Sequence, residues 1–568
     1  MNIKKRDGRI VEFDPTKIHN AILKAFAEVD GKLSDYAIEK ATRIADYIHT
    51  IGQDKELTID EIQTLVENGL MATKRRDVAH AYIEYRQLRD ILRSTPLDQP
   101  ALDLVKGKNE DLKTENSNKR AEVVTTQRDY LAGILSKYIA KKYIFPENII
   151  KDHEKGVIHI HDMDYMAQET LSNCCLINLN DMLQNGTVIN GVLIEKPHRL
   201  ITAMTIATQI VSAVASSQYG GCTFTLSHLA PFVRDSYNRY IKKYREYGFD
   251  DITCEKMADV DIAKEIEDAV QTMNYQLNSF TTTNGQSPFV SVAIYLNENP
   301  EYKEEIAKLA EEIFKQRIQG LKNPQGVSVT QAFPKLLYVL DTNNSNEKCE
   351  YWWLTKLAAK CTAKRMVPDY VSEKVMIENK GGCWPSMGCR SSLTPDRVTE
   401  KYGNIAKALD YNGKPKYYGR ANIGVTTINL PYVALEAQQT KKNFYELLNH
   451  YLEECHEVQR IRAERLSTTK AKVAPILWCY GALARLDPEE TLESLVHNGY
   501  MTSSLGYVGI FETTKIITGV SHTTEKGKRF AKELMQHLND KCNEWKSAEN
   551  IDYSLYGTPK PMLRSLGA

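Results

Sequence analysis

The chain lacks net charge and long apolar runs. Its 73 basic residues balance its 73 acidic residues, so no overall electrostatic field favours nucleic acid or an anionic membrane as a partner. No run of about 18 apolar residues occurs, and the N-terminal segment Met1–Asp7 contains no apolar signal core, so neither membrane insertion nor export is indicated. A cytoplasmic protein is expected.

Cysteine is scarce and scattered. The 568 residues contain 11 cysteines and no Cys-x-x-Cys pair. An odd, scattered set does not form a disulfide framework. A structural zinc site of the knuckle type needs closely spaced thiolates, so the sequence predicts none, and no other metal site is predicted.

The sequence does contain enough apolar residues, 42% of the chain, for a large core and more than one domain. Residues 1–94 are predicted to be mainly helical. Ile18, Ile22, Phe26 and Val29 recur at helical spacing, and Thr58-x-x-Glu61 is a capping box at the start of another helix, which continues the apolar pattern. Residues 95–125 are polar and are expected to form a linker.

Residues 126–568 are predicted to form one α/β domain. Short strand-like runs alternate there with long helical patterns, the strands at 157–160, 289–294 and 473–477 and the helices at 201–217 and 444–466. Such alternation is typical of α/β folds.

The first module opens on a turn rich in basic residues, Lys5, Arg6 and Arg9, and Lys17 follows on a helix. Such a cluster can hold a polyphosphate, although alone it is more often solvated surface. The opening and the closing segment 77–86 resemble the two ends of an ATP-cone, the regulatory nucleotide-binding module of ribonucleotide reductases and their repressors. The resemblance implies that the four basic residues hold phosphates of ATP or dATP, which regulate the protein if they stabilise different arrangements.

Two histidines alternate with isoleucines in the segment Gly156–Asp162. On a strand, His159 and His161 share one face while both isoleucines share the other. A His-x-His face can bind a metal, but no third ligand is recognisable nearby, so hydrogen-bonding roles are favoured.

Two consecutive cysteines follow, Cys174 and Cys175. On a strand they point to opposite faces, so at most one of them faces a site. For a single cysteine the ordinary role is that of a small buried apolar residue.

A set of short motifs runs in order along the large domain. They are Asn173-Cys174, Gln218–Gly221, Asn284–Phe289, Phe333–Lys335, Met387–Ser391, Gly419–Gly424, Asn429–Pro431 and Ser504–Ile510. Each motif is weak alone, but together they closely resemble the anaerobic (class III) ribonucleoside-triphosphate reductases. The resemblance implies a ten-stranded α/β barrel in two five-stranded halves, with a central finger loop that carries a cysteine.

The implied reaction converts ribonucleoside triphosphates into 2′-deoxyribonucleoside triphosphates with formate as reductant. Replacing the 2′-hydroxyl with hydrogen requires a radical at C3′, and a thiyl radical is able to abstract that hydrogen. The resemblance implies that Cys389 carries the thiyl and that Cys174 delivers hydrogen on the 2′ side. Asn422 is then expected to hydrogen-bond substrate or formate, and Cys175 is structural.

Further candidates for substrate binding are His159, His161, Ser504, Gly506 and Gly509. The glycine-rich run that contains the last three precedes a helical pattern, so its backbone amides can cradle phosphates. A packed barrel strand followed by a turn explains the same run.

The family continues past the matching segment 553–559 with a zinc site and a radical-bearing glycine, and neither is encoded before Ala568. The chain alone is therefore expected to be inactive. The resemblance implies a radical-SAM iron–sulfur activase, a homodimer and a separate C-terminal glycyl-radical polypeptide as partners. A second nucleotide site is expected near residues 205–221.

Two alternatives stay open. The chain can be a nucleotide-binding regulatory fragment with a degenerate barrel, although the intact Cys174, Cys389 and Asn422 argue against decay. It can also be a relative of pyruvate formate-lyase, in which adjacent cysteines act as a relay. That family's pair lies on the central loop, whereas the loop here has a single cysteine.

Overall fold

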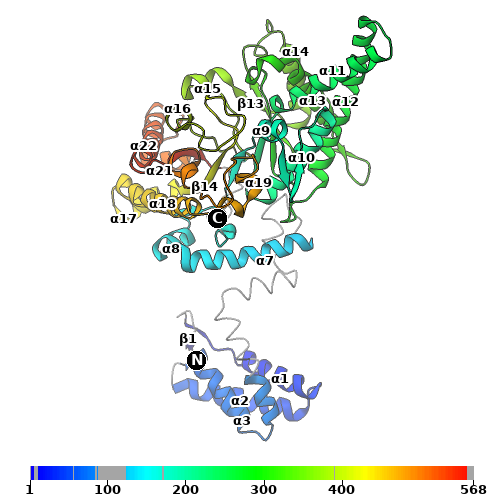
Figure 1. The fold of residues 1–568 in the computed structure, drawn as a ribbon. Helices are drawn as coiled ribbons and strands as arrows, with labels where there is room; N and C mark the ends of the chain where they lie inside the picture. The colour runs from blue at the N-terminus through cyan, green and yellow to red at the C-terminus, as the bar shows by residue number, and fades with distance from the viewer. Residues whose placement is uncertain are drawn as a thin grey trace. The chain divides into compact units, whose positions relative to one another are not determined.

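The computed structural model describes residues 2–4, 10–54, 57–83, 86, 123–168, 172–388 and 390–558. The chain divides into two compact units, Met1–Lys108 and Asn109–Ala568, drawn in Figure 1. Each unit is described by itself. No helix in the described ranges is long and apolar enough to cross a membrane.

The first unit is mainly helical with a small sheet in the order β2-β1-β3. Its elements are β1 (Asn2–Lys4), β2 (Ile10–Glu12), α1 (Pro15–Asp30), α2 (Asp35–Asp54), β3 (Leu57–Thr58) and α3 (Ile59–Met71). Thr58 caps α3, and Glu61 closes the predicted capping box. Ile22 and Phe26 are fully buried on α1, but Val29 is 38% exposed, so the apolar stripe ends one turn earlier than expected.

The second unit is built on a nine-stranded mixed sheet in the order β13-β12-β9-β8-β5-β14-β15-β16, with β4 also paired to β14. The strands of this sheet are β4 (Ile158–Ile160), β5 (Cys174–Leu176), β8 (Cys222–Thr225), β9 (Val290–Ile294), β12 (Lys335–Leu340), β13 (Asp369–Ser372), β14 (Arg420–Asn429), β15 (Thr502–Val508) and β16 (Asp552–Gly557). Two separate hairpins are β6 (Thr187–Ile189) with β7 (Val192–Ile194) and β10 (Leu321–Lys322) with β11 (Ser328–Val329).

The sheet has two parallel groups. Strands β5, β8, β9, β12 and β13 run parallel to one another, as do β14, β15 and β16. The groups meet where β14 pairs antiparallel with β5, and β4 also pairs antiparallel with β14. The first group has the five strands expected of one half-barrel, whereas the described part of the sheet has nine strands in place of the expected ten.

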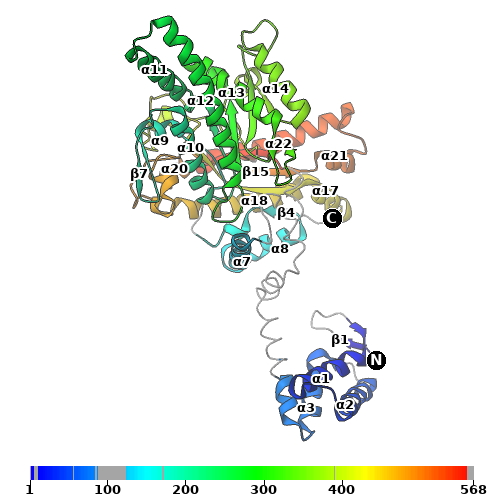
Figure 2. The same cartoon turned by 90° about the vertical axis from the view of Figure 1, so that its right-hand side faces the viewer.

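Helices cover the outside of this sheet. They are α7 (Val124–Ile139), α8 (Glu147–Lys155), α9 (Leu179–Asn185), α10 (Leu200–Ser216), α11 (Ala230–Glu246), α12 (Asp251–Ser279), α13 (Lys303–Gln319), α14 (Trp352–Arg365), α15 (Glu373–Lys380), α16 (Val398–Tyr402), α17 (Leu430–Thr440), α18 (Phe444–Ser467), α19 (Pro475–Trp478), α20 (Glu493–His497), α21 (Ile510–Thr518) and α22 (Glu525–Glu549). Figures 1 and 2 show α11 to α14 beside the first strand group and α17, α21 and α22 beside the second.

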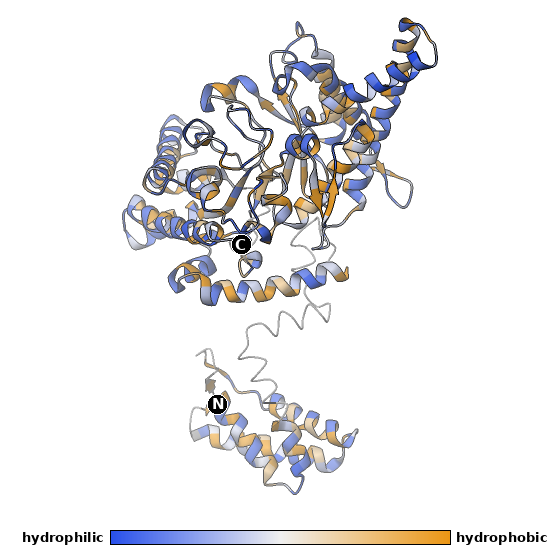
Figure 3. Ribbon diagram, viewed as in Figure 1, coloured by the Kyte–Doolittle hydropathy of each residue, from blue (hydrophilic) through white to orange (hydrophobic). Residues whose placement is uncertain are grey.

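The main core lies between these helices and the sheet. Figure 3 shows largely hydrophobic strands inside and hydrophilic residues on the outer helices. The predicted strands at 157–160 and 289–294 and both predicted helices are present. The strand predicted at 473–477 is wrong, because the segment enters the short helix α19 at Pro475. Proline fixes a helical φ at the first helical position, and a short apolar run does not distinguish a strand from a buried helix.

Candidate active site

The expected finger loop lies between α15 and α16 and is packed against β5. Trp384, Met387 and Leu393 of the loop form a buried cluster with Cys174 and Leu176. Cys389 lies outside the described residues, but both of its neighbours in the chain are described. The loop therefore approaches the wall that carries Cys174.

The tip of the loop touches the sheet through two glycines. A Cβ added to Gly388 would lie 2.6 Å from the Cα of Gly221, and one added to Gly221 would lie 2.8 Å from the Cα of Gly388. Neither residue has room for a side chain. The loop is held further by the Thr223 hydroxyl, which donates to the carbonyl of Ser386 at 3.1 Å.

Asn422 lies on β14 beside this loop and is fully buried. Its Nδ2 donates to the hydroxyl of Ser504 at 2.7 Å and to that of Ser391 at 3.3 Å. Its Oδ1 has no hydrogen-bond partner in the described part of the chain. A buried amide oxygen left in this way is available to a bound ligand.

Cys174 is the register partner of Asn422 across the β5–β14 pair. The Cys174 thiol donates to Oδ1 of Asn173 at 3.0 Å, and the backbone amide of Asn173 donates to the carbonyl of Asn422 at 2.9 Å. The structure thus brings together two of the predicted site residues, Cys174 and Asn422, with the loop that carries the third.

Cys175 lies on the other face of β5, in the main hydrophobic core. Burial raises the pKa of its thiol, and burial also raises the pKa of its register partner Cys222 to about 12. Both thiols therefore remain protonated at neutral pH.

The two histidines share one face of β4 and its continuation. Their ring centroids lie 4.5 Å apart, and Nε2 of His161 is 2.7 Å from the hydroxyl of Thr427. Burial lowers the pKa of His159 to about 3 and lowers that of His161, with a further contribution from Arg462. Both rings are therefore neutral near pH 7. The isoleucines Ile158 and Ile160 belong to the core on the opposite face.

The glycine-rich run forms strand β15 and the start of α21. Ser504 binds Asn422, and a Cβ on Gly506 would collide with the hydroxyls of Thr427 and Thr558. Gly509 has a φ of 83° and is the N-cap of α21. Of the three residues of this run predicted for substrate binding, only Gly509 is at a helix N-terminus.

Several side chains around this site were not predicted. Tyr165 and Tyr219 stack at 5.4 Å, and Asn284 donates to the Tyr165 hydroxyl at 3.2 Å. Ser391 and Tyr219 belong to the ordered motifs of the large domain, so the sequence could have indicated them as site residues. Tyr165 and Thr427 have no local sequence signal.

A second unpredicted group lies where strands β8 and β9 end. Glu298 accepts from Ser227 at 2.6 Å and from Tyr418 at 2.7 Å, and it also accepts from Thr225. Burial raises its pKa, and these hydroxyl donors oppose the rise. His228 packs edge-on against Tyr418 at 4.7 Å between ring centroids.

In the first unit, Lys17 extends from the first turn of α1. Its side chain is 83% exposed, and its Nζ lies 3.7 Å from a carboxylate oxygen of Asp14. Lys5, Arg6 and Arg9 lie outside the described residues. The cluster of four basic residues therefore stays a prediction.

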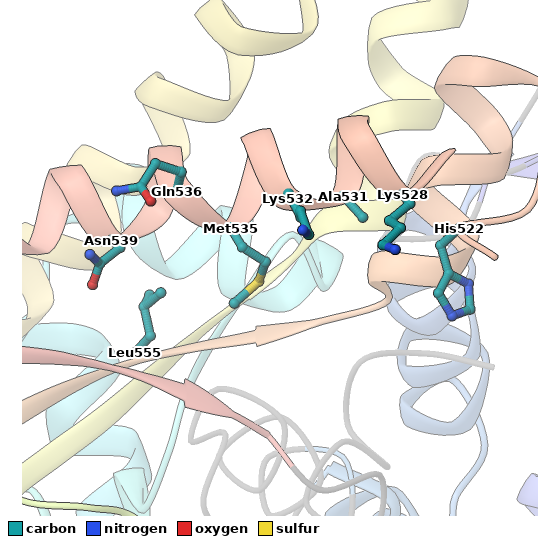
Figure 4. Close-up of a pocket in the computed structure, with 8 residues that line it drawn as sticks. All are labelled: His522, Lys528, Ala531, Lys532, Met535, Gln536, Asn539 and Leu555. Atoms are coloured by element: carbon teal, nitrogen blue, oxygen red, sulfur yellow. The ribbon is translucent and has the colours of Figure 1, made fainter. Parts of the chain in front are cut away.

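A hollow of about 570 Å³ lies on the outside of the second unit, along α22 and β16. Figure 4 shows the side chains around it, including Lys528, Lys532, Met535 and Leu555. None of the predicted site residues lines it, so the site described above is a different place.

Comparisons with known proteins match both units. The family "Anaerobic ribonucleoside-triphosphate reductase" matches residues 115–562, and the family "ATP cone domain" matches residues 1–91. The anaerobic ribonucleoside-triphosphate reductase of Escherichia coli is 36% identical over 99% of this chain and 77% of its own length. The enzyme of that name from Enterobacteria phage T4 is 35% identical over 81% of this chain and 73% of its own length.

The fold is also similar to solved structures. The anaerobic ribonucleotide reductase from Thermotoga maritima with citrate in the active site has a TM-score of 0.55 at 15% identity, covering 85% of each chain. The same enzyme with dATP in the specificity site has a TM-score of 0.56 at 14% identity, covering 85% of this chain and 79% of its own. The motifs, the fold and a relative that matches 99% of this chain agree, and the chain belongs to the anaerobic ribonucleoside-triphosphate reductase family.

Proposed function

We propose that this chain reduces ribonucleoside triphosphates to 2′-deoxyribonucleoside triphosphates with formate as the reductant. The observation that carries the proposal is the meeting of Cys174 and Asn422 with Gly388 and Ser391 of the loop at one buried place, where the Asn422 Oδ1 has no partner in the described residues. Formate or a ribose hydroxyl can occupy such a place, because it offers neutral hydrogen-bonding groups in a dry environment.

The steps follow from the residue types. The Cys389 thiol would become a thiyl by giving its hydrogen atom to a glycyl radical, which would supply the oxidising power. Cys389 takes the hydrogen atom from C3′, the 2′-hydroxyl leaves as water, and Cys174 delivers a hydrogen atom at C2′. Formate gives Cys174 a hydrogen atom in its place and gives the remaining electron, with a proton, to the 3′-ketone. Cys389 then returns its hydrogen atom to C3′, which restores the thiyl. Formate supplies the two electrons and leaves as CO₂. The balance is nucleoside triphosphate plus formate plus one proton to deoxynucleoside triphosphate, CO₂ and water.

Asn422 has a positioning role in this proposal. Its amide nitrogen donates to the hydroxyls of Ser391 and Ser504, which fixes the side-chain plane and leaves the oxygen without a partner in the described residues. An amide stays neutral at every working pH, so it orients the substrate or formate without adding a negative charge beside the formate carboxylate.

Membership of the reductase family also suggests the effectors and partners of this chain. ATP and dATP are proposed as ligands of the cone at residues 1–94, joined by a linker at 95–125 to the barrel at 126–568. A radical-SAM activase, a second copy of the chain and a polypeptide that carries the glycyl radical are proposed partners. Among the described residues no group of three or more cysteines has its sulfur atoms close enough to hold a metal ion, so these cysteines do not fit a tetrathiolate zinc site, and no step depends on zinc.

The test is anaerobic reduction of a ribonucleoside triphosphate with isotopically labelled formate, ATP, activase, S-adenosylmethionine, reductant and the radical-bearing polypeptide. Expected products are deoxynucleotide and labelled CO₂ in equal amounts. Cys174→Ser should abolish both, and Asn422→Ala should slow both by about 100-fold. The matched control Cys175→Ser, on the opposite face, should retain turnover.

Two results contradict the proposal. One is equal turnover by wild type and Cys174→Ser. The other is ATP binding without turnover in any mixture, once assembly of the pieces has been verified by their co-elution, which favours a regulatory role.

A further inference from the structure

We propose that Asp152, His450 and Glu454 form a site for a divalent transition-metal ion, Zn²⁺ being the best fit, where α8 meets α18. One ligand atom from each of the three side chains lies within 4.8 Å of the others. None of the three belongs to the active site described above, and the sequence alone predicted no metal site.

Helix geometry places the ligands together. His450 and Glu454 are four residues apart on α18, so they lie one turn apart on the same face. Asp152 comes from the last turn of α8. Asn148, one turn earlier on α8, donates to Oε1 of Glu454 at 3.0 Å and so orients that carboxylate.

The electrostatics require a cation or a proton at this place. Glu454 is only 5% exposed, and its Oε2 has no hydrogen-bond partner in the part of the chain that the structure describes. Burial raises the pKa of Glu454, and Asp152 raises it further. Two carboxylates this close repel each other strongly in a low-dielectric setting unless a positive charge or a proton lies between them.

Lys155 does not supply all of that charge. Its Nζ lies 2.7 Å from Oδ1 of Asp152 and balances one of the two negative charges. The second oxygen of the Asp152 carboxylate remains available as a metal ligand. One negative charge therefore remains beside the imidazole of His450. Bound Zn²⁺ would more than neutralise this charge, and the ion would be held by one nitrogen and two oxygen ligands.

The donor set selects the kind of ion. Imidazole favours zinc and its transition-metal neighbours over magnesium and calcium, which prefer oxygen ligands alone. Three protein ligands leave a tetrahedral position for water. The His450 side chain is 62% exposed, so an ion can reach the site from solvent.

Such an ion would tie α8 to α18 behind the active-site strands. Farther along α18, Gln459 donates to the backbone carbonyl of Ser504 at 2.7 Å, and Arg462 donates to that of His161. The structure thus assigns the ion a bracing role rather than a catalytic one.

The test titrates the metal-free, reduced full chain with Zn²⁺ by calorimetry and with Co²⁺ by its visible absorption bands. One site is expected in the wild type, and Glu454→Gln and His450→Ala should each weaken it by at least about tenfold. The matched controls are Glu453→Gln on the same helix and His497→Ala, and both should bind as the wild type does. Circular dichroism checks that each variant is folded.

Three outcomes overturn the proposal: no Zn²⁺ or Co²⁺ binding by the wild type, unchanged binding by Glu454→Gln, or binding of Mg²⁺ with equal affinity. If the wild type binds no metal and Glu454→Gln is more stable at neutral pH, the two carboxyl groups share a proton instead.

Discussion

The two faces of the strands around the active site differ sharply, although their residues alternate along the same backbones. One face contributes to the site and the other to the main core. The site face has His159, Cys174 and Asn422, and the core face has Ile158, Ile160, Cys175, Ala421 and Ile423.

The two faces differ in how well they tolerate substitutions. On the core face, stabilisation comes from buried apolar area, which many aliphatic side chains supply nearly equally well. On the site face the positions of individual polar atoms matter. In the Asn422 amide, Nδ2 donates to Ser504, whereas Oδ1 has no partner in the described residues. The adjacent cysteines therefore have different requirements, although the two side chains are identical.

The largest effect should come from closing the space between the loop and the sheet. Gly221→Ala would place a Cβ 2.2 Å from Cδ1 of Phe289 and 2.8 Å from the Cα of Gly388, and only a backbone shift relieves the second contact. We expect a loss of about 3 kcal/mol in the free energy of unfolding of the large unit, measured by urea denaturation. In the control Gly557→Ala the nearest atom would be 3.5 Å away, so little change is expected. A wild-type stability for Gly221→Ala would show that the loop is not seated there.

The cysteine pair tests the two faces directly. Cys175→Ser buries a hydroxyl in the apolar core and should cost about 2 kcal/mol in unfolding free energy. Cys174→Ser keeps the donor that binds Oδ1 of Asn173 and should cost less than about 1 kcal/mol. Urea denaturation of both variants measures the difference. Equal losses would remove the proposed distinction.

The stability of the large unit should depend on pH through the buried His228. Burial lowers the pKa of His228 from 6.5 to about 4, while Asp410 raises it and Lys416 lowers it. The unfolded chain therefore binds more protons, and this contribution to stability, complete above about pH 6.5, is lost as the pH falls toward about 4.

His228→Phe keeps the ring contact with Tyr418 and removes the proton site. Between pH 7 and about pH 5.5 the wild type should lose roughly 1 kcal/mol relative to this variant. Urea denaturation at a series of pH values measures the difference. Parallel pH profiles would show that His228 is not the group responsible.

The smallest effect should come from the solvent side of the loop. Arg390 pairs with Asp369, and the two side chains are 33% and 50% exposed. Asp369→Asn should cost less than about 1 kcal/mol, because solvent screens such pairs. We expect faster amide hydrogen exchange in residues 384–393 and little change in the free energy of unfolding. A larger loss would mean that the pair, and not the glycine contact, holds the loop.

Local patterns predicted much of the framework. The alternation of histidines and isoleucines predicted the two faces of β4, and Thr58 with Glu61 predicted the start of α3. These signals work because side-chain direction and capping depend on near neighbours. The segment around Pro475 was predicted wrongly because apolar composition says only that a segment is buried.

The sequence by itself determined the helix and strand periods, the separate first module and, through the ordered motifs, the family. Only the tertiary structure decided which atoms meet. Asn422 reaches Ser391 across 31 residues and Ser504 across 82, and Asn148 reaches Glu454 across 306. No local pattern encodes such contacts, because they depend on strand order, register and helix packing, which are properties of the whole folded chain.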